Sequence, residues 1–325
     1  MERFQRPILL SVIIGIALYF GAMFLGDFEA TKASLAKVPW YAWLIIFGLS
    51  LFNYALRYLR WDWFIKNLSG IPIPHRLHVS YYLAGFALST TPGKAGESVR
   101  SFYLKRHGVP FNQSISTLFV ERLMDLLTIV ILSVLAAYYF EDYRIFVVVT
   151  VVVIFFCLPF IHSRRVLGLL ESKTSALPGK WGGAGQHLVR MLESSAVLLK
   201  NRQLYGGMLI GLLAWGAEGV GLWYTLVVLG QDVEWMMAAS VYGVAVLVGA
   251  LSFLPGGLGS TELVMGLLLV ALGIDEGVAI AATLICRIAT LWFAVFIGLG
   301  VAGTLAMQGI SPGISQKEEV EEQHV

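Results

Sequence analysis

Long apolar runs separated by short polar segments dominate the chain. Six of these runs are close to or above the ~20 residues that a helix needs to cross a bilayer. They are Ile8 to Leu25, Trp40 to Leu56, Ser114 to Tyr139, Ile145 to Ile161, Leu204 to Leu229 and Val278 to Met307. The pattern predicts an all-α membrane protein, a polytopic helical bundle.

Two further apolar stretches, Leu77 to His107 and Val233 to Leu272, are each broken by a Pro-Gly motif. The pieces after the breaks, Glu97 to His107 and Ser260 to Leu272, would form only about 17 to 20 Å of helix at ~1.5 Å per residue. Neither piece can cross ~30 Å of hydrocarbon comfortably. We therefore predict that each stretch is a re-entrant, broken helical hairpin.

The two broken stretches are copies of one motif. Leu88 to Gly96 reads LSTTPGKAG, and Leu251 to Gly259, shifted by 163 positions, reads LSFLPGGLG. Paired interruptions in the two halves of a membrane protein are the best sequence indication of a transporter's binding site. The repeat motifs span 77–139 and 233–307, and a shift of 165 relates Gly108 to Gly273 and Arg122 to Arg287.

Composition agrees with a membrane protein and narrows the possible partners. Hydrophobic residues make up 57% of the chain, charged residues make up 14%, and the mean hydropathy is +0.75, which a soluble domain would not show. The net charge of +2 is too small to indicate a nucleic-acid partner. Cys157 and Cys286 lie in apolar runs and give no disulfide framework, and His75 with His78 fits a headgroup-level segment better than a metal site.

The distribution of basic residues orients the chain. Arg57, Arg60, Lys66 and Arg76 share one side with the base-rich loop 162–203, and the positive-inside rule makes that side cytoplasmic. We predict a single transmembrane domain over 1–310 with both termini in the cytoplasm, in the cell membrane, and with the two repeats inverted. Residues 162–203 are predicted to be a cytoplasmic loop with an amphipathic helix, and residues 311–325 a disordered acidic tail.

The Pro-Gly motifs have a physical purpose at a hairpin tip. Proline ends a helix, and glycine permits the dihedral angles of a tight reversal. The helix that starts after each break presents free N–H groups, which favour an anion. Ordinary helix bends are the alternative explanation. The predicted hinge residues are Pro92, Gly93, Gly96, Pro255, Gly256, Gly257 and Gly259.

Arginines deep in the apolar runs are the strongest candidates for binding. Arg122 and Arg287 lie roughly 13 to 15 Å deep at ~1.5 Å per residue, where an arginine must face a cavity or a partner. Glu121 and Asp125 can form a helix-locking ion pair with Arg122, so its removal should damage folding. Arg287 has Glu262, Glu218 or a substrate as candidate partners, and we expect it to be available to a headgroup. The predicted substrate-binding residues are Arg287, Arg122, Arg100, Lys94, Glu262, Glu218, Glu97, Ser260 and Thr261.

These residues carry a family resemblance. TPGKAGESVR at 91–100, ERLMD at 121–125 and LPGGLGSTE at 254–262 resemble the signature of the lysylphosphatidylglycerol synthase transmembrane family, a group of flippase-like membrane proteins. The likeness covers roughly Ile8 to Met307. It implies a domain that moves a lipid between leaflets, which in some members is fused to a soluble aminoacyl transferase domain. No stretch here is long and polar enough for such a domain, so lysyl transfer is not implied.

The sequence thus favours a lipid transporter or flippase for an anionic or headgroup-modified lipid. Nucleotide-binding, nucleophile-elbow and zinc-ligand motifs are missing from the sequence, and we expect neither a cofactor nor a catalytic residue. A membrane-embedded enzyme, or a scaffold for enzymes of envelope lipid or glycan biosynthesis, is the alternative. The expected partners are a membrane lipid and such enzymes, and the oligomeric state stays open.

Overall fold

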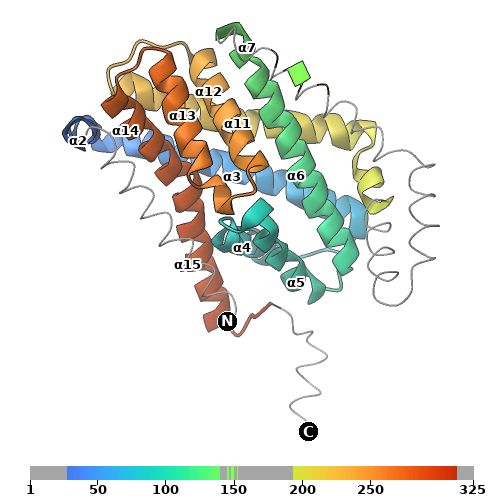
Figure 1. Ribbon diagram of the computed structural model, residues 1–325. Helices are drawn as coiled ribbons and strands as arrows, with labels where there is room; N and C mark the ends of the chain where they lie inside the picture. Colours follow the sequence, from blue (N-terminus) through green and yellow to red (C-terminus); the bar gives the residue numbers. More distant parts are fainter. Residues whose placement is uncertain (1–27, 140–144, 146–147, 150–151, 153–192, 313–325) are drawn as a thin grey trace.

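The computed structural model describes residues 28–139, 145, 148–149, 152 and 193–312, and within these residues every regular element is a helix (Figure 1). The predicted runs Ile8 to Leu25 and Ile145 to Ile161, most of the loop 162–203 and almost all of the acidic tail lie outside them. The elements are α2 (Phe28–Ala36), α3 (Trp40–Ser69), α4 (His75–Gly85), η1 (Phe86–Leu88), η2 (Pro92–Ser98), α5 (Val99–Lys105), α6 (Phe111–Val134), α7 (Ala136–Tyr139), α11 (Asn201–Val228), α12 (Trp235–Leu251), η4 (Pro255–Gly257), α13 (Ser260–Ala271), α14 (Glu276–Arg287), η5 (Ile288–Trp292) and α15 (Phe293–Met307).

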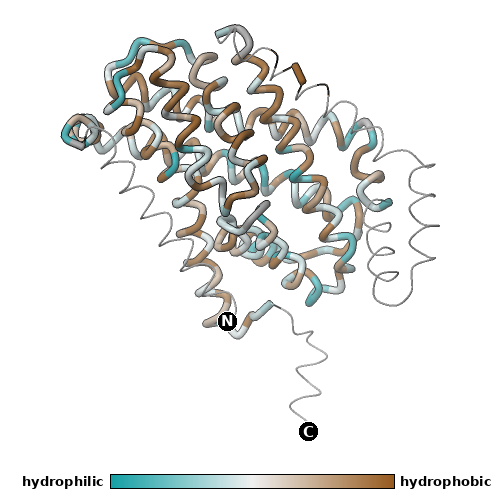
Figure 2. The backbone as a smooth tube through the Cα atoms, in the orientation of Figure 1, coloured by the Kyte–Doolittle hydropathy of each residue, from teal (hydrophilic) through white to brown (hydrophobic). Residues whose placement is uncertain are grey.

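Three of these segments are long and apolar enough to cross a membrane: Trp40–Ser69, Arg202–Val228 and Glu276–Met307. Helix α6 has 24 residues, but it carries Glu121, Arg122 and Asp125 near its middle. Figure 2 shows apolar residues along the whole length of α13 and α15, and several hydrophilic residues in the loops. Large apolar side chains such as Trp40, Leu44 and Phe296 are more than half exposed, as expected for lipid contact. The prediction of a helical membrane protein is confirmed.

Small residues on α11 let its neighbours approach closely. A Cβ at Gly207 would lie 2.6 Å from Met124 Sδ and 2.8 Å from Phe64 Cζ, and one at Gly211 would lie 2.7 Å from Thr128 Oγ1. Such contacts are closer than a Cβ normally makes, so a larger residue at either position would displace its neighbours. Since helix association in lipid depends on close packing, α11 can hold α3, α6 and α12 around it.

Both broken stretches are interrupted where the sequence predicted, and their tips touch. The first runs through α4, η1, η2 and α5, and the second through α12, η4 and α13. Helix α13 begins at Ser260 as expected. In the first copy a 3₁₀ turn over 92–98 delays α5 to Val99. Motif η2 contacts η4, and a Cβ on Gly256 would lie 3.3 Å from Thr90 Cα, so the two Pro-Gly motifs lie side by side.

The segment from α14 to α15 is one continuous helix with a π turn, η5, directly after Arg287. Tyr54 on α3 donates its hydroxyl to the carbonyl of Thr290 at 2.9 Å within that turn. Such π turns are often found at functional sites. This one places Arg287, Thr290 and Leu291 on the same cavity wall.

Candidate functional site

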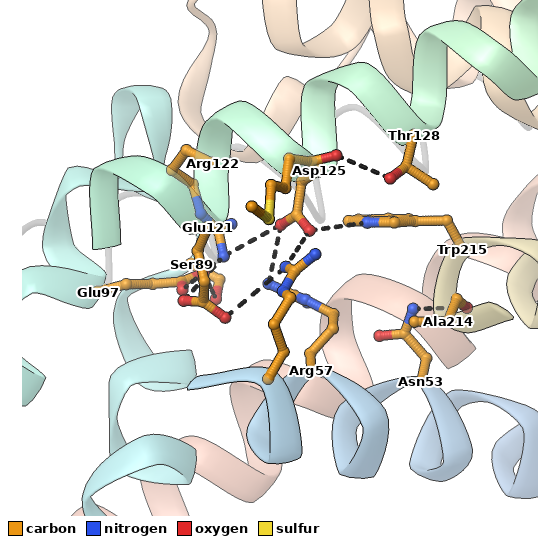
Figure 3. Close-up of polar contacts among 12 residues, drawn as sticks. Asn53, Arg57, Ser89, Glu97, Glu121, Arg122, Asp125, Thr128, Ala214 and Trp215 are labelled. Atoms are coloured by element: carbon orange, nitrogen blue, oxygen red, sulfur yellow. Dashed lines mark hydrogen bonds and ion pairs between the residues drawn. The ribbon is translucent and has the colours of Figure 1, made fainter. Parts of the chain in front are cut away.

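Asp125 on α6 is the centre of a buried ion network (Figure 3). Its Oδ1 lies 2.5 Å from Arg60 Nη2 and accepts a hydrogen bond from Trp215 Nε1 at 3.0 Å. Its Oδ2 lies 3.5 Å from Arg57 Nη2 and 3.2 Å from Arg122 Nη2. Three helices, α3, α6 and α11, thus meet at one carboxylate.

A second group joins the first hairpin to α6. Arg100 on α5 pairs with Glu97, and its Nη1 lies 3.1 Å from Glu121 Oε2. Ser89 donates its hydroxyl to Glu97 at 3.0 Å. The guanidinium of Arg100 also stacks over the Tyr82 ring at 4.1 Å, a favourable cation–π geometry. All of these groups are buried, so the first hairpin is fixed to α6 by charge and packing together.

The second hairpin has an ion pair of its own. Arg287 Nε lies 2.7 Å from Glu262 Oε1, and Arg287 Nη2 donates to the carbonyl of Gly256 at 2.8 Å. Glu262 Oε2 accepts the N–H of Gly259 at 2.8 Å and so caps the start of α13. Of the partners considered from the sequence, the structure selects Glu262. Arg287 also lines the cavity described below, so its contact with a headgroup stays a prediction.

The two hairpins repeat one ion pair. The shift of 165 positions that relates Arg122 to Arg287 also relates Glu97 to Glu262. Arg122 Nη2 lies 3.6 Å from Glu97 Oε2, against 2.7 Å for Arg287 and Glu262. In each copy, the acid at the start of the short helix thus meets the arginine of the following long helix.

The tips differ in how they use glycine. Gly256, Gly257 and Gly259 have positive φ, as the hinge hypothesis requires. In the first copy the positive φ, +55°, is that of Lys94. Gly96 has a different role there, because a Cβ at this position would lie only 2.5 Å from Leu88 Cβ. Lys94 is the positional equivalent of Gly257, whose φ is +67°. The two copies therefore share a positive φ at this one position, which is a lysine in the first copy and a glycine in the second.

A cavity of about 330 Å³ lies against both tips and the ion network. Its polar wall includes Arg57, Lys94, Arg122, Arg287 and Glu218. Along the same cavity lie Leu251, Phe253 and Leu254, which are 49%, 73% and 45% exposed. A charged wall and an exposed apolar rim suit an amphipathic ligand.

Positive charge exceeds negative charge at this wall. Arg57, Lys94, Arg122 and Arg287 line the cavity with four basic side chains, whereas Asp125 lines it with one carboxylate. Glu218 adds at most one further negative charge. Nε of both Arg57 and Arg122 is buried without a hydrogen bond to any described residue, whereas the Nη2 atoms are ion-paired with Asp125. Burying such donors is costly, so an anion in the cavity would stabilise them.

Not every predicted binding residue reaches the cavity. Lys94, Arg122, Glu218, Thr261 and Arg287 line it. Glu97, Arg100 and Glu262 act behind the wall as partners of other charges, and Ser260 bonds within its own hairpin, to Ser252 at 2.9 Å. Glu121 and Asp125 contact Arg122 as expected, and Asp125 also lines the cavity.

Two arginines of the site are not among the binding residues predicted from the sequence. Arg57 and Arg60 are 4% and 0% exposed and contact Asp125. The helix that begins at Trp40 continues past the apolar run to Ser69, and both arginines lie on it. The sequence does contain a signal for them. Asn53, Arg57 and Arg60 are spaced by four and three positions, which puts them on one polar face of a helix.

Comparison with known proteins places the chain among membrane proteins. A family model described as the lysylphosphatidylglycerol synthase TM region matches residues 12–298. A UPF0104 membrane protein of Pyrococcus horikoshii is 20% identical, with 89% of this chain and 94% of the relative covered. Another, of Methanothermobacter thermautotrophicus, is 25% identical over 96% of this chain and 98% of its own length. A third, of Methanocaldococcus jannaschii, is 23% identical over 91% of this chain and 92% of its own length.

Proposed function

The chain belongs to the family of the lysylphosphatidylglycerol synthase TM region, and we propose that it is a lipid transporter or flippase. Its cargo would be an anionic or headgroup-modified membrane lipid, moved between leaflets. One observation carries the proposal: a buried wall with excess positive charge and unbonded guanidinium N–H groups faces a cavity with an exposed apolar rim.

A lipid headgroup crosses hydrocarbon slowly because burying its charge without partners is costly. Arg57, Lys94 and Arg122 would provide those partners for a phosphate, and charge-assisted hydrogen bonds from arginine suit phosphate oxygens. The cavity volume of about 330 Å³ suits a headgroup rather than a whole lipid. The acyl chains would stay outside, beside Phe253 and Leu254.

The same proposal includes the topology. We take the two Pro-Gly segments as re-entrant hairpins of inverted repeats, with their tips near the midplane of the bilayer. The contact between η2 and η4 and the repeated acid–arginine pair support this arrangement. In such transporters the substrate site lies between the repeats, and one repeat rocks against the other.

Native mass spectrometry of the gently purified protein tests the proposal. We expect a phosphate-bearing anionic lipid to stay bound to the wild-type protein. Lys94→Met should reduce its occupancy because the variant removes a cavity cation. Lys105→Met is the matched control, since Lys105 is exposed at the end of α5, and it should retain the lipid. Retention of neutral lipids alone, or equal occupancy in both variants, would contradict the proposed function.

A further inference from the structure

Glu218 differs from the other buried carboxylates of the site. It lies on α11, is 3% exposed and lines the cavity, and its Oε2 accepts a hydrogen bond from Ser50 Oγ at 3.1 Å. Glu97, Glu121, Asp125 and Glu262 each have an arginine within 4 Å. Across the described ranges, by contrast, no Lys, Arg or His nitrogen lies within 4 Å of Glu218.

The groups facing Glu218 come from several elements. Arg57 and Tyr54 belong to α3, Lys94 to η2 and Asp125 to α6. Tyr242 faces it from α12, and Cys286 with Arg287 from α14. The cations among them act across the cavity rather than as direct partners. A headgroup that binds Arg57 and Lys94 would therefore share those cations with Glu218.

Two negative charges that share one set of cations are thermodynamically linked. Binding of an anionic headgroup disfavours a negative charge on Glu218, and by reciprocity a proton on Glu218 favours binding of the headgroup. Carboxylates that face cavities within membranes commonly serve as proton relays in transporters. Glu218 has the burial, the isolation and the cavity access that this role needs.

We propose that Glu218 is a proton-binding site that couples the movement of an anionic lipid to the movement of a proton in the same direction. A carboxylate oxygen of Glu218 takes up one proton from water on one side, with the headgroup in the cavity. It returns that proton to water on the other side once the headgroup leaves. This inference rests on the proposed function, because it requires a lipid in the cavity.

The test uses the protein reconstituted in vesicles that contain a fluorescently labelled phosphatidylglycerol and an imposed pH gradient. With one proton per lipid, the label should accumulate in the leaflet facing the more alkaline compartment, by up to about tenfold per pH unit. Glu218→Gln keeps the side-chain size and an acceptor for Ser50, so the fold should be retained. It should equalise the label between leaflets whatever the gradient.

Glu276→Gln is the control, because Glu276 is exposed at the start of α14, and it should accumulate label as the wild type does. If the wild type moves label but ignores the gradient, or if Glu218→Gln still responds to it, the coupling proposal is wrong while the transport proposal stands. If the wild type moves no label, the proposed function fails.

An infrared measurement tests the proton site without a lipid. Difference spectra between acidic and alkaline samples should contain the C=O band of a buried carboxylic acid. Glu218→Gln should remove this band, and Glu276→Gln should leave it. A band that survives Glu218→Gln, or a wild-type spectrum without one, would overturn the assignment whatever the vesicles show.

Discussion

At the scale of single residues, Lys94 carries an unusual conformational cost. A non-glycine residue at φ +55° costs of the order of 1 kcal/mol, and the second copy avoids this with Gly257. The ammonium lines the cavity, with Nζ 5.5 Å from the Trp215 ring centre. Strained residues often mark functional positions, and here the strain places a basic side chain at the hairpin tip.

Two substitutions separate the strain from the charge. Lys94→Gly should raise the free energy of unfolding by up to ~1 kcal/mol, since glycine accepts this φ, whereas Lys94→Met should not. Both should slow lipid movement by about tenfold, the effect of losing ~1.4 kcal/mol of interaction. Thermal unfolding in detergent and leaflet exchange in vesicles measure the two effects. Unchanged exchange in either variant would remove Lys94 from the binding wall.

His78 on α4 makes the fold sensitive to acid. Trp61 Nε1 donates to its Nε2 at 3.0 Å, so Nδ1 carries the proton and donates to Asp62 at 2.9 Å. Burial lowers the pKa of His78 from its ordinary value of 6.5, although Asp62 acts in the opposite direction. The unfolded chain therefore binds a proton more readily. The contribution of His78 to the free energy of unfolding should be fully present above about pH 6.5. It should fall as the pH drops below that value.

Unfolding curves at several pH values check this expectation. His78→Gln should flatten the dependence below the ordinary histidine pKa, because the titrating group is gone. His75→Gln, at an exposed position three residues earlier, should keep the wild-type slope. Equal slopes in the two variants would show that another group causes the acid sensitivity.

Residue-level prediction from sequence succeeded where partners are close along the chain. Arg122 and Asp125 are three positions apart on one helix, so helical spacing alone predicted their contact. The partners of Asp125 on α3 and α11, Arg60 and Trp215, depend on how helices pack. No local pattern shows that, and the network around Asp125 was therefore only partly predictable.

At the scale of elements, Arg122 and Arg287 differ in the partners that their removal would leave behind. Without Arg122, Asp125 still has Arg60, and Glu97 and Glu121 still have Arg100. Without Arg287, Glu262 loses an ion pair at 2.7 Å, and the Gly256 carbonyl loses a hydrogen-bond donor. The helix α13 and its tip therefore depend more on Arg287 than α6 depends on Arg122.

A double-mutant cycle measures this dependence. Arg287→Met should destabilise the protein by about 3 kcal/mol, because it strands a mostly buried carboxylate. Glu262→Gln in the same chain should recover much of that loss, since a neutral amide can still accept the Gly259 N–H. Arg122→Met should cost less than Arg287→Met. Additive effects of the first two substitutions would contradict a direct Arg287–Glu262 coupling.

The elements themselves were predictable to different degrees. Helix α13 begins at Ser260 as the motif indicated, because proline and positive-φ glycines end the preceding helix there. The 3₁₀ turn at 92–98 and the π turn at 288–292 were not predicted. At the π turn the Thr290 carbonyl accepts the hydroxyl of Tyr54, a contact between distant segments that no local pattern in the apolar run indicates.

At the scale of the whole molecule, the predicted orientation in the membrane depends on fewer basic residues than the sequence alone indicated. Arg57 and Arg60 belong to the buried network, which leaves Lys66 and Arg76 with the loop 162–203. We still expect that side to be cytoplasmic. With Cys157 and Cys286 replaced by serine, an impermeant thiol reagent outside intact cells should label a cysteine at Gln231 and spare one at Ser172. The opposite labelling would invert the topology.

The central claim is that the charged cavity between the two hairpin tips carries a lipid headgroup from one leaflet to the other. Leaflet exchange of labelled phosphatidylglycerol in vesicles containing only this protein tests it most directly. Exchange should be fast with the wild type, should slow about tenfold with Lys94→Met and should stay fast with Lys105→Met. Exchange no faster than in protein-free vesicles, or equally fast with all three proteins, would contradict the claim.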